Sequence, residues 1–87
     1  MKTRSSIELK DTVGMMCSSD YKERFKAEYY QNVIHYQKLA AILEKWDNGG
    51  LDFEPVCPRS IYNVQIKAMT DYIAVLEARA VMEGIEL

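Results

Sequence analysis

The sequence predicts an all-α fold, an antiparallel helical hairpin of two long helices that assembles into a homo-oligomeric helical bundle. Two long segments carry apolar residues at the alternating three- and four-residue steps of a helix. A connector rich in Asn, Gly and Pro separates them. A chain of 87 residues is one domain at most, and one core of that size stabilises a fold by only about 3 to 5 kcal/mol. Self-association would add to that stability.

The N-terminal segment differs in pattern from the rest of the chain. Residues 1–18 mix charged residues, serine and glycine without a sustained period. We therefore expect a poorly ordered or loosely docked leader, followed by a single helical-hairpin domain over residues 19–87. Ile7, Leu9 and Val13 are the apolar residues with which the leader could dock as a short element.

The first long helix is expected at about residues 20–47. Asp20 can cap its start, and Glu23 follows at the spacing of a capping box. A heptad seam runs along the helix, with a single polar residue, Asn32, in it. The seam consists of Phe25, Tyr29, Asn32, Tyr36, Leu39, Leu43 and Trp46.

A connector is expected over residues 48–57. The run DNGG ends the first helix, because Asn and Gly tolerate the left-handed conformation common at helix C-termini. Leu51, Phe53 and Val56 are apolar, so we expect the connector to be a packed loop with these side chains tucked against the helices.

The second long helix is expected at about residues 58–83. Pro58 suits a first helical turn, and Gly84 provides the stop. Its seam consists of Tyr62, Ile66, Met69, Ile73, Leu76 and Ala80, and a second apolar row consists of Ile61, Ala68, Tyr72 and Val75. The two rows together are wider than one partner helix would cover. This excess predicts stacking of copies through residues 61–82, and the alternative is a monomer with a docked leader.

The candidate interface residues come from both helices. They are Asn32, Ile66, Met69, Ile73 and Leu76. Gln65 and Arg79 lie within the apolar stripe of the second helix, where an unpaired polar group is costly. They would either pair across a helix interface and fix its register, or line a pocket in which Tyr72 stacks on a ligand and Arg79 binds phosphate or carboxylate.

Further candidate ligand-binding residues lie at the start of the second helix and among the tyrosines. Arg59 and Ser60 accompany free backbone amides at the positive end of the helix dipole, where an anion could bind. The alternative is a plain helix start that Ser60 caps locally. Tyr29 and Tyr36 offer rings for stacking on a base, although tyrosines at helical spacing are also common at interfaces.

Composition argues against several other functions. A net charge of −2 and a pI near 5.3 disfavour bulk nucleic-acid binding. No apolar run reaches the roughly 18 residues of a membrane span. Cys17, Cys57 and His35 are too few and too dispersed for a metal site, and none has a partner placed for catalysis. We expect free thiols, no catalytic residues, no metal and no cofactor.

A motif in the second helix resembles a known family. The motif QxxxMxxYxxxLxxR is formed by Gln65, Met69, Tyr72, Leu76 and Arg79. Together with SSDYKERFKAEYYQ, LEKWDNGGLDF and LEARAVMEGIEL it is similar to small α-helical proteins of gut phages, related to a protein of crAss-like phages and found in phages and prophages of Firmicutes. The resemblance covers about residues 18–87. It implies a phage protein in the host bacterial cytoplasm, helical and oligomeric, that acts on host defence.

Two modes of action fit this expectation. The first is a non-enzymatic sponge that sequesters a cyclic nucleotide immune signal in pockets of the homo-oligomer. The second is an inhibitor that lays a helix face against a host defence protein such as a CRISPR effector. A structural or regulatory phage protein is the remaining alternative.

Overall fold

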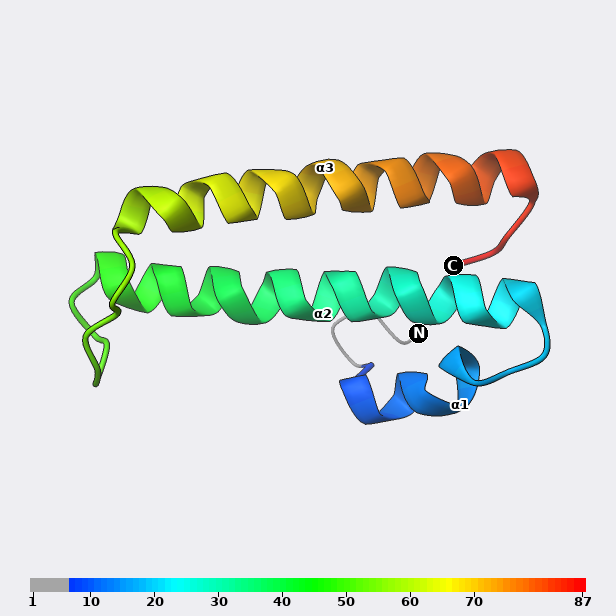
Figure 1. The fold of residues 1–87 in the computed structure, drawn as a ribbon, viewed down its shortest axis with the longest axis horizontal. Helices are drawn as coiled ribbons and strands as arrows, with labels where there is room; N and C mark the ends of the chain where they lie inside the picture. The colour runs from blue at the N-terminus through cyan, green and yellow to red at the C-terminus, as the bar shows by residue number, and fades with distance from the viewer. Residues whose placement is uncertain (1–6) are drawn as a thin grey trace.

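The computed structural model describes residues 7–87. In chain order, its elements are the short 3-10 helix η2 (Leu9–Thr12) and the helices α1 (Val13–Met16), α2 (Tyr21–Asp47) and α3 (Arg59–Glu83). No strand occurs in this part of the chain. α2 and α3 run antiparallel side by side, and α1 lies on the opposite side of α2 (Figure 1). The prediction of an all-α hairpin is confirmed, and its oligomeric state stays a prediction.

The helix ends follow local chemistry. The Asp20 side chain caps α2 by accepting a hydrogen bond from the Lys22 amide at 3.0 Å. The expected reciprocal bond from Glu23 does not form, because the Asp20 amide donates to Ser18 Oγ at 3.0 Å instead. α3 begins directly after Pro58 and ends at Gly84, which takes the left-handed conformation with φ 68°. Glycine adopts this conformation without the steric cost that a side chain would bring.

The hydrophobic core lies nearer the open end of the hairpin than the connector. It consists of Phe25, Tyr29, Val33, Leu76, Ala80 and Ile85. Tyr29 is fully buried, and its hydroxyl donates to Glu77 Oε2 at 2.7 Å. Ile85 reaches this core because the chain folds back toward α2 after Gly84 (Figure 1). This cluster therefore joins the two long helices where α2 begins and α3 ends, and Leu43 is buried nearer the connector.

The leader docks on α2 through a polar contact. Thr12 is buried, donates to the Leu9 carbonyl at 2.7 Å and accepts from Gln31 Nε2 at 2.9 Å. Val13, which we expected to help docking, is exposed. Residues 1–6 of the expected leader lie outside the described residues.

The connector is less packed than its sequence predicts. Leu51 is half-buried, but Phe53 is 54% exposed and Val56 is 99% exposed. The expectation that these two side chains tuck against the helices is therefore wrong. Pro55 and Pro58 flank Val56 and restrict the backbone on both sides of it, so this residue has little freedom to turn inward.

Two further observations bear on surface chemistry. Cys17 and Cys57 are free thiols, and both are exposed. Across residues 7–87, no helix combines the length and the hydropathy that a membrane crossing demands.

Candidate functional site

An arginine and a tryptophan meet where the connector joins the two long helices. Arg59, the first residue of α3, lies 5.9 Å from the centre of the Trp46 ring. Its Nε and Nη2 donate to the two carboxylate oxygens of Asp47 at 3.1 and 3.2 Å. Its Nη1 donates to Asn63 Oδ1 at 2.6 Å. Because Asp47 is the last residue of α2, this fork of hydrogen bonds ties the end of one helix to the start of the next.

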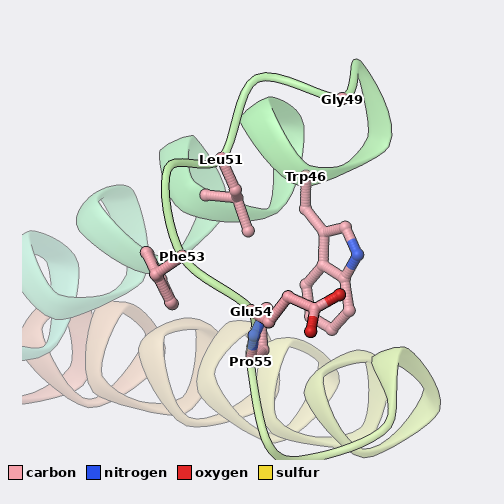
Figure 2. A pocket seen from close by; sticks show the side chains of 6 residues that line it. All are labelled: Trp46, Gly49, Leu51, Phe53, Glu54 and Pro55. Atoms are coloured by element: carbon pink, nitrogen blue, oxygen red, sulfur yellow. The ribbon is translucent and has the colours of Figure 1, made fainter.

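The Trp46 side chain borders an open hollow under the connector. The hollow has a volume of about 350 Å³ and is lined by Trp46, Gly49, Leu51, Phe53, Glu54 and Pro55. Figure 2 shows the indole of Trp46 on the α2 side of this space and the side chain of Leu51 on the connector side. An edge-to-face contact with Tyr62, with ring centroids 5.6 Å apart, supports the indole from α3. The ring is thus held in place while part of it remains accessible.

This arrangement suits a flat polar ring with an attached anion. The indole of Trp46 and the ring of Phe53 offer aromatic surface, and stacking on such surface is tolerant of base identity. The Glu54 carboxylate can accept hydrogen bonds from amino groups. Arg59 is not part of this lining; it borders a second hollow of about 490 Å³, on the α2 side of the same corner. Its planar fork of donors matches carboxylate and phosphate oxygens.

The open end of the hairpin holds a second arginine, and there the contacts are structural. The guanidinium of Arg79 lies 4.9 Å from the centre of the Phe25 ring, which is buried in the core. Arg79 Nη2 donates to the Tyr21 hydroxyl at 3.0 Å, and its Nε donates to Glu83 Oε2 at 3.2 Å. The Tyr21 hydroxyl donates to Glu83 Oε1 at 2.6 Å. These bonds connect the start of α2 to the end of α3.

The same network shifts the titration of its members. The hydrogen bond from Tyr21, followed by the bond and the charge of Arg79, holds the pKa of the Glu83 carboxyl below its usual value. The hydrogen bond to Glu83 raises the pKa of the Tyr21 hydroxyl, and the same carboxylate raises the pKa of Arg79. All three groups therefore keep their ordinary charge states at neutral pH. A phosphate at Arg79 would have to displace Glu83.

The predicted ligand-binding residues do not converge in one chain. Arg59 and Arg79 are twenty residues apart along α3, which is about 30 Å at the helical rise. Tyr72 and Gln65 lie exposed on α3, and Ser60 is exposed at its start. The remaining two predicted residues belong to the space between the helices, with Tyr29 in the core and Tyr36 at a small hollow beside Glu77.

The predicted interface residues lie mostly within the hairpin itself. Leu76 is fully buried, Ile73 packs against the core, and Ile66 and Met69 are half-buried. Asn32 donates from Nδ2 to the Glu28 carbonyl at 2.8 Å, within its own helix. In the single chain, Asn32 therefore bonds back to α2 and does not pair with Gln65 or Arg79.

Sequence reasoning did not assign a binding role to the residues that surround the hollow. Trp46 was read as a seam residue, and Leu51 and Phe53 as packing residues of the connector. The available signal was the position of the single tryptophan at the helix end, directly before the DNGG turn. An aromatic side chain there has no further helical turn to cover it.

A protein-family comparison assigns the chain. The model of the Sequestin family matches residues 19–82. The chain belongs to the Sequestin family. The match includes Trp46, the connector and Arg59, whereas the docked leader of this Sequestin family member falls outside it. The expected relation to crAss-like phage proteins is not part of this match. No curated protein and no solved structure matches the chain.

Proposed function

We propose that this Sequestin family member is a sponge that binds a cyclic nucleotide immune signal and holds it without chemical change. The observation that carries the proposal is the hollow lined by Trp46, together with the Arg59 guanidinium that lies 5.9 Å from the centre of the same ring. The family name, which denotes sequestration, supports the same conclusion. In this role the protein acts in the host bacterial cytoplasm as a phage anti-defence protein, and the signal is withdrawn from its receptor by mass action.

The base is the part of the ligand that the hollow would recognise. Stacking of one base on an aromatic side chain is worth about 1 to 3 kcal/mol, and Trp46 and Phe53 both line the space. Phe53 is more than half exposed in the free chain. If the connector closed over a bound base, the Phe53 ring would become buried. Ligand binding would therefore explain an aromatic residue that is left exposed in the free protein.

The phosphate would take the place of Asp47 on Arg59. The present partner already occupies the guanidinium in the two-bond geometry that a phosphate would use. The Asp47 side chain is well exposed, so its carboxylate can return to water when it is displaced. Exposed ion pairs contribute only about 0 to 1 kcal/mol, so this exchange costs little.

Uptake of ligand by the purified protein tests the proposal. Native mass spectrometry with a panel of cyclic dinucleotides, cyclic trinucleotides and cyclic ADP-ribose isomers should show a stoichiometric mass increase for at least one compound. After the protein is denatured, the compound should be recovered with an unchanged mass, because a sponge performs no reaction. Trp46→Ala and Arg59→Ala should each reduce uptake, while Tyr72→Ala, an aromatic substitution away from the hollow, should not.

Two results would count against it. If uptake is the same in Trp46→Ala and Arg59→Ala as in the wild type, the ligand binds elsewhere and the hollow is not the site. If no compound in the panel binds, the alternative of an inhibitor that contacts a defence protein is favoured. A pull-down from host lysate would then be the next experiment.

A further inference from the structure

One side of α3 carries a row of exposed apolar side chains that Arg79 interrupts between Val75 and Met82. The outer row consists of Ile61, Val64, Ala68, Tyr72, Val75 and Met82. All six are exposed, whereas Leu76 and Ala80, which face α2, are buried. The outer row extends over roughly 32 Å at the helical rise of 1.5 Å per residue. Apolar residues at such spacing on one helix face are typical of a surface that packs against another helix.

Nothing in the described chain covers the outer row. α2 is covered on both sides, by α1 and η2 and by α3, but α3 packs only on α2 among the described elements (Figure 1). The protein is elongated, with dimensions of 43 × 25 × 23 Å and a radius of gyration of 15.1 Å. A compact chain of this length has a radius of gyration of about 12 Å. In the stack of α1, α2 and α3, the outer face of α3 is therefore both apolar and uncovered.

The outer row is self-complementary in an antiparallel arrangement. Around Tyr72, four of its members pair symmetrically, and a two-fold axis brings Ile61 opposite Met82 of a second copy, while Val64 lies opposite Arg79. The same axis brings the small Ala68 opposite the larger Val75, which allows the two helices to approach closely.

The polar residues in the row fit the same axis. Gln65 and Arg79 are each seven residues from Tyr72, on the same side of α3. In an antiparallel pair, Gln65 of one copy therefore lies beside Arg79 of the other, where the amide oxygen can accept from the guanidinium. The edge of the row carries one charge of each sign, Lys67 and Asp71, joined at 3.0 Å. The axis near Tyr72 brings the two copies of Asp71 toward each other, and each of these carboxylates is already paired with its own Lys67.

We propose that α3 pairs with α3 of a second copy in an antiparallel, two-fold symmetric dimer through the outer row. The layers then run α1, α2, α3 and, in the partner, α3, α2, α1, so that every long helix is covered on both sides. The pairing leaves the connector end of each protomer accessible, and it does not depend on the identity of any ligand. It also accounts for Gln65, a polar residue that is exposed in the single chain.

Sedimentation velocity on four proteins tests the pairing. The wild type should sediment as a species of twice the 10.1 kDa chain mass. Val64→Glu and Val75→Glu, in the outer row, should sediment as monomers, with dimer affinity reduced at least tenfold. Val81→Glu is the matched control, since Val81 is 83% exposed on α3 but lies outside the row, and it should remain dimeric. Far-UV circular dichroism should show the same helix content in all four.

Cysteine cross-linking tests the antiparallel orientation. In a background with Cys17→Ser and Cys57→Ser, Tyr72→Cys lies beside the axis and should form a disulfide-linked dimer. Ile61→Cys alone should not, because the two copies of residue 61 lie at opposite ends of the interface.

Three outcomes would overturn the proposal. A monomeric wild type would leave the row to a different protein, and unchanged dimers of both Val64→Glu and Val75→Glu would place the interface elsewhere. Efficient cross-linking of Ile61→Cys alone would mean that the helices are parallel.

Discussion

Each end of the hairpin holds an arginine against an aromatic ring, but the two pairs lie in different surroundings. At the open end, Arg79 covers Phe25, which belongs to the core. At the connector end, Arg59 lies over Trp46, which borders an open hollow. Both arginines bind a carboxylate, Glu83 and Asp47 respectively. An arginine over an aromatic ring therefore stabilises the fold where the ring belongs to the core. Where the ring borders an open hollow, the same contact is available for ligand binding.

The largest effect is expected from the core at the open end. Leu76→Ala removes a fully buried side chain and should lower the free energy of unfolding by about 2 to 5 kcal/mol. Urea denaturation followed by circular dichroism measures this change. The control Val81→Ala, at a largely exposed position of the same helix, should change it by less than about 0.5 kcal/mol. Equal effects of the two would show that the open end does not hold the hairpin together.

A large effect on binding, with a smaller effect on stability, is expected at the connector end. Trp46→Ala should weaken ligand affinity by roughly tenfold or more, because it removes a stacking surface worth about 1 to 3 kcal/mol per base. Isothermal titration calorimetry measures the affinity, and a thermal melt measures the stability. The result that contradicts the comparison is a Trp46→Ala protein that is destabilised as much as Leu76→Ala and still binds its ligand.

Substitution of each of the two arginines should separate the effect on ligand affinity from the effect on stability. Arg59→Ala should weaken ligand binding and lower the melting temperature less than Arg79→Ala does. The reason is that Arg59 lies over the half-buried Trp46 ring, whereas Arg79 lies over Phe25 of the core. Arg79→Ala should lower the melting temperature by a few degrees, since it removes the links to Tyr21 and Glu83, and should leave ligand affinity unchanged. Paired melts and titrations of both variants check this. Loss of binding in Arg79→Ala, with the fold intact, would move the site toward the open end.

A smaller effect is expected from pH. The pKa of Glu83 is lower in the folded chain than its ordinary value of 4.5, so the ionised carboxylate stabilises the fold above that value. This contribution is lost as pH falls through the lowered pKa of the folded state. The melting temperatures of the wild type and Glu83→Gln should therefore differ at neutral pH and converge once the pH falls below the lowered pKa of Glu83. A difference that persists in acid would assign the effect to packing.

Local patterns predicted the fold well. Apolar spacing, Pro58 and Gly84 gave both long helices to within one residue at their starts, because these signals act within a few residues of the chain. Four members of the outer row of α3 were also predicted as a second apolar row, which together with the first is too wide for one partner helix, but Val64 and Met82 were not included. The exposure of Phe53 and Val56 was not predicted, because the course of a connector depends on how two helix ends are placed in space.

The candidate site was predicted only in part. Arg59 was identified from its position at a helix start, whereas the hollow beside Trp46 depends on residues from the connector folding back over the end of α2. Arg79 and Tyr72 lie on the same helix face in the sequence pattern, but Arg79 turns toward Tyr21, which begins α2 at the same open end of the hairpin. A contact across 58 residues leaves no periodic signal. For this reason the sequence pattern could not distinguish pairing of Arg79 with another side chain from binding of a ligand.

Fluorescence of Trp46 tests the central claim most directly, because the chain contains a single tryptophan and it lines the hollow. The nucleotide panel is titrated into wild-type protein and into Arg59→Ala, with emission followed at each addition. The account predicts saturable quenching or a shift of the emission by a compound that native mass spectrometry shows to bind, and a weaker response in Arg59→Ala. A compound that binds stoichiometrically while the Trp46 emission stays unchanged would contradict sequestration at this site.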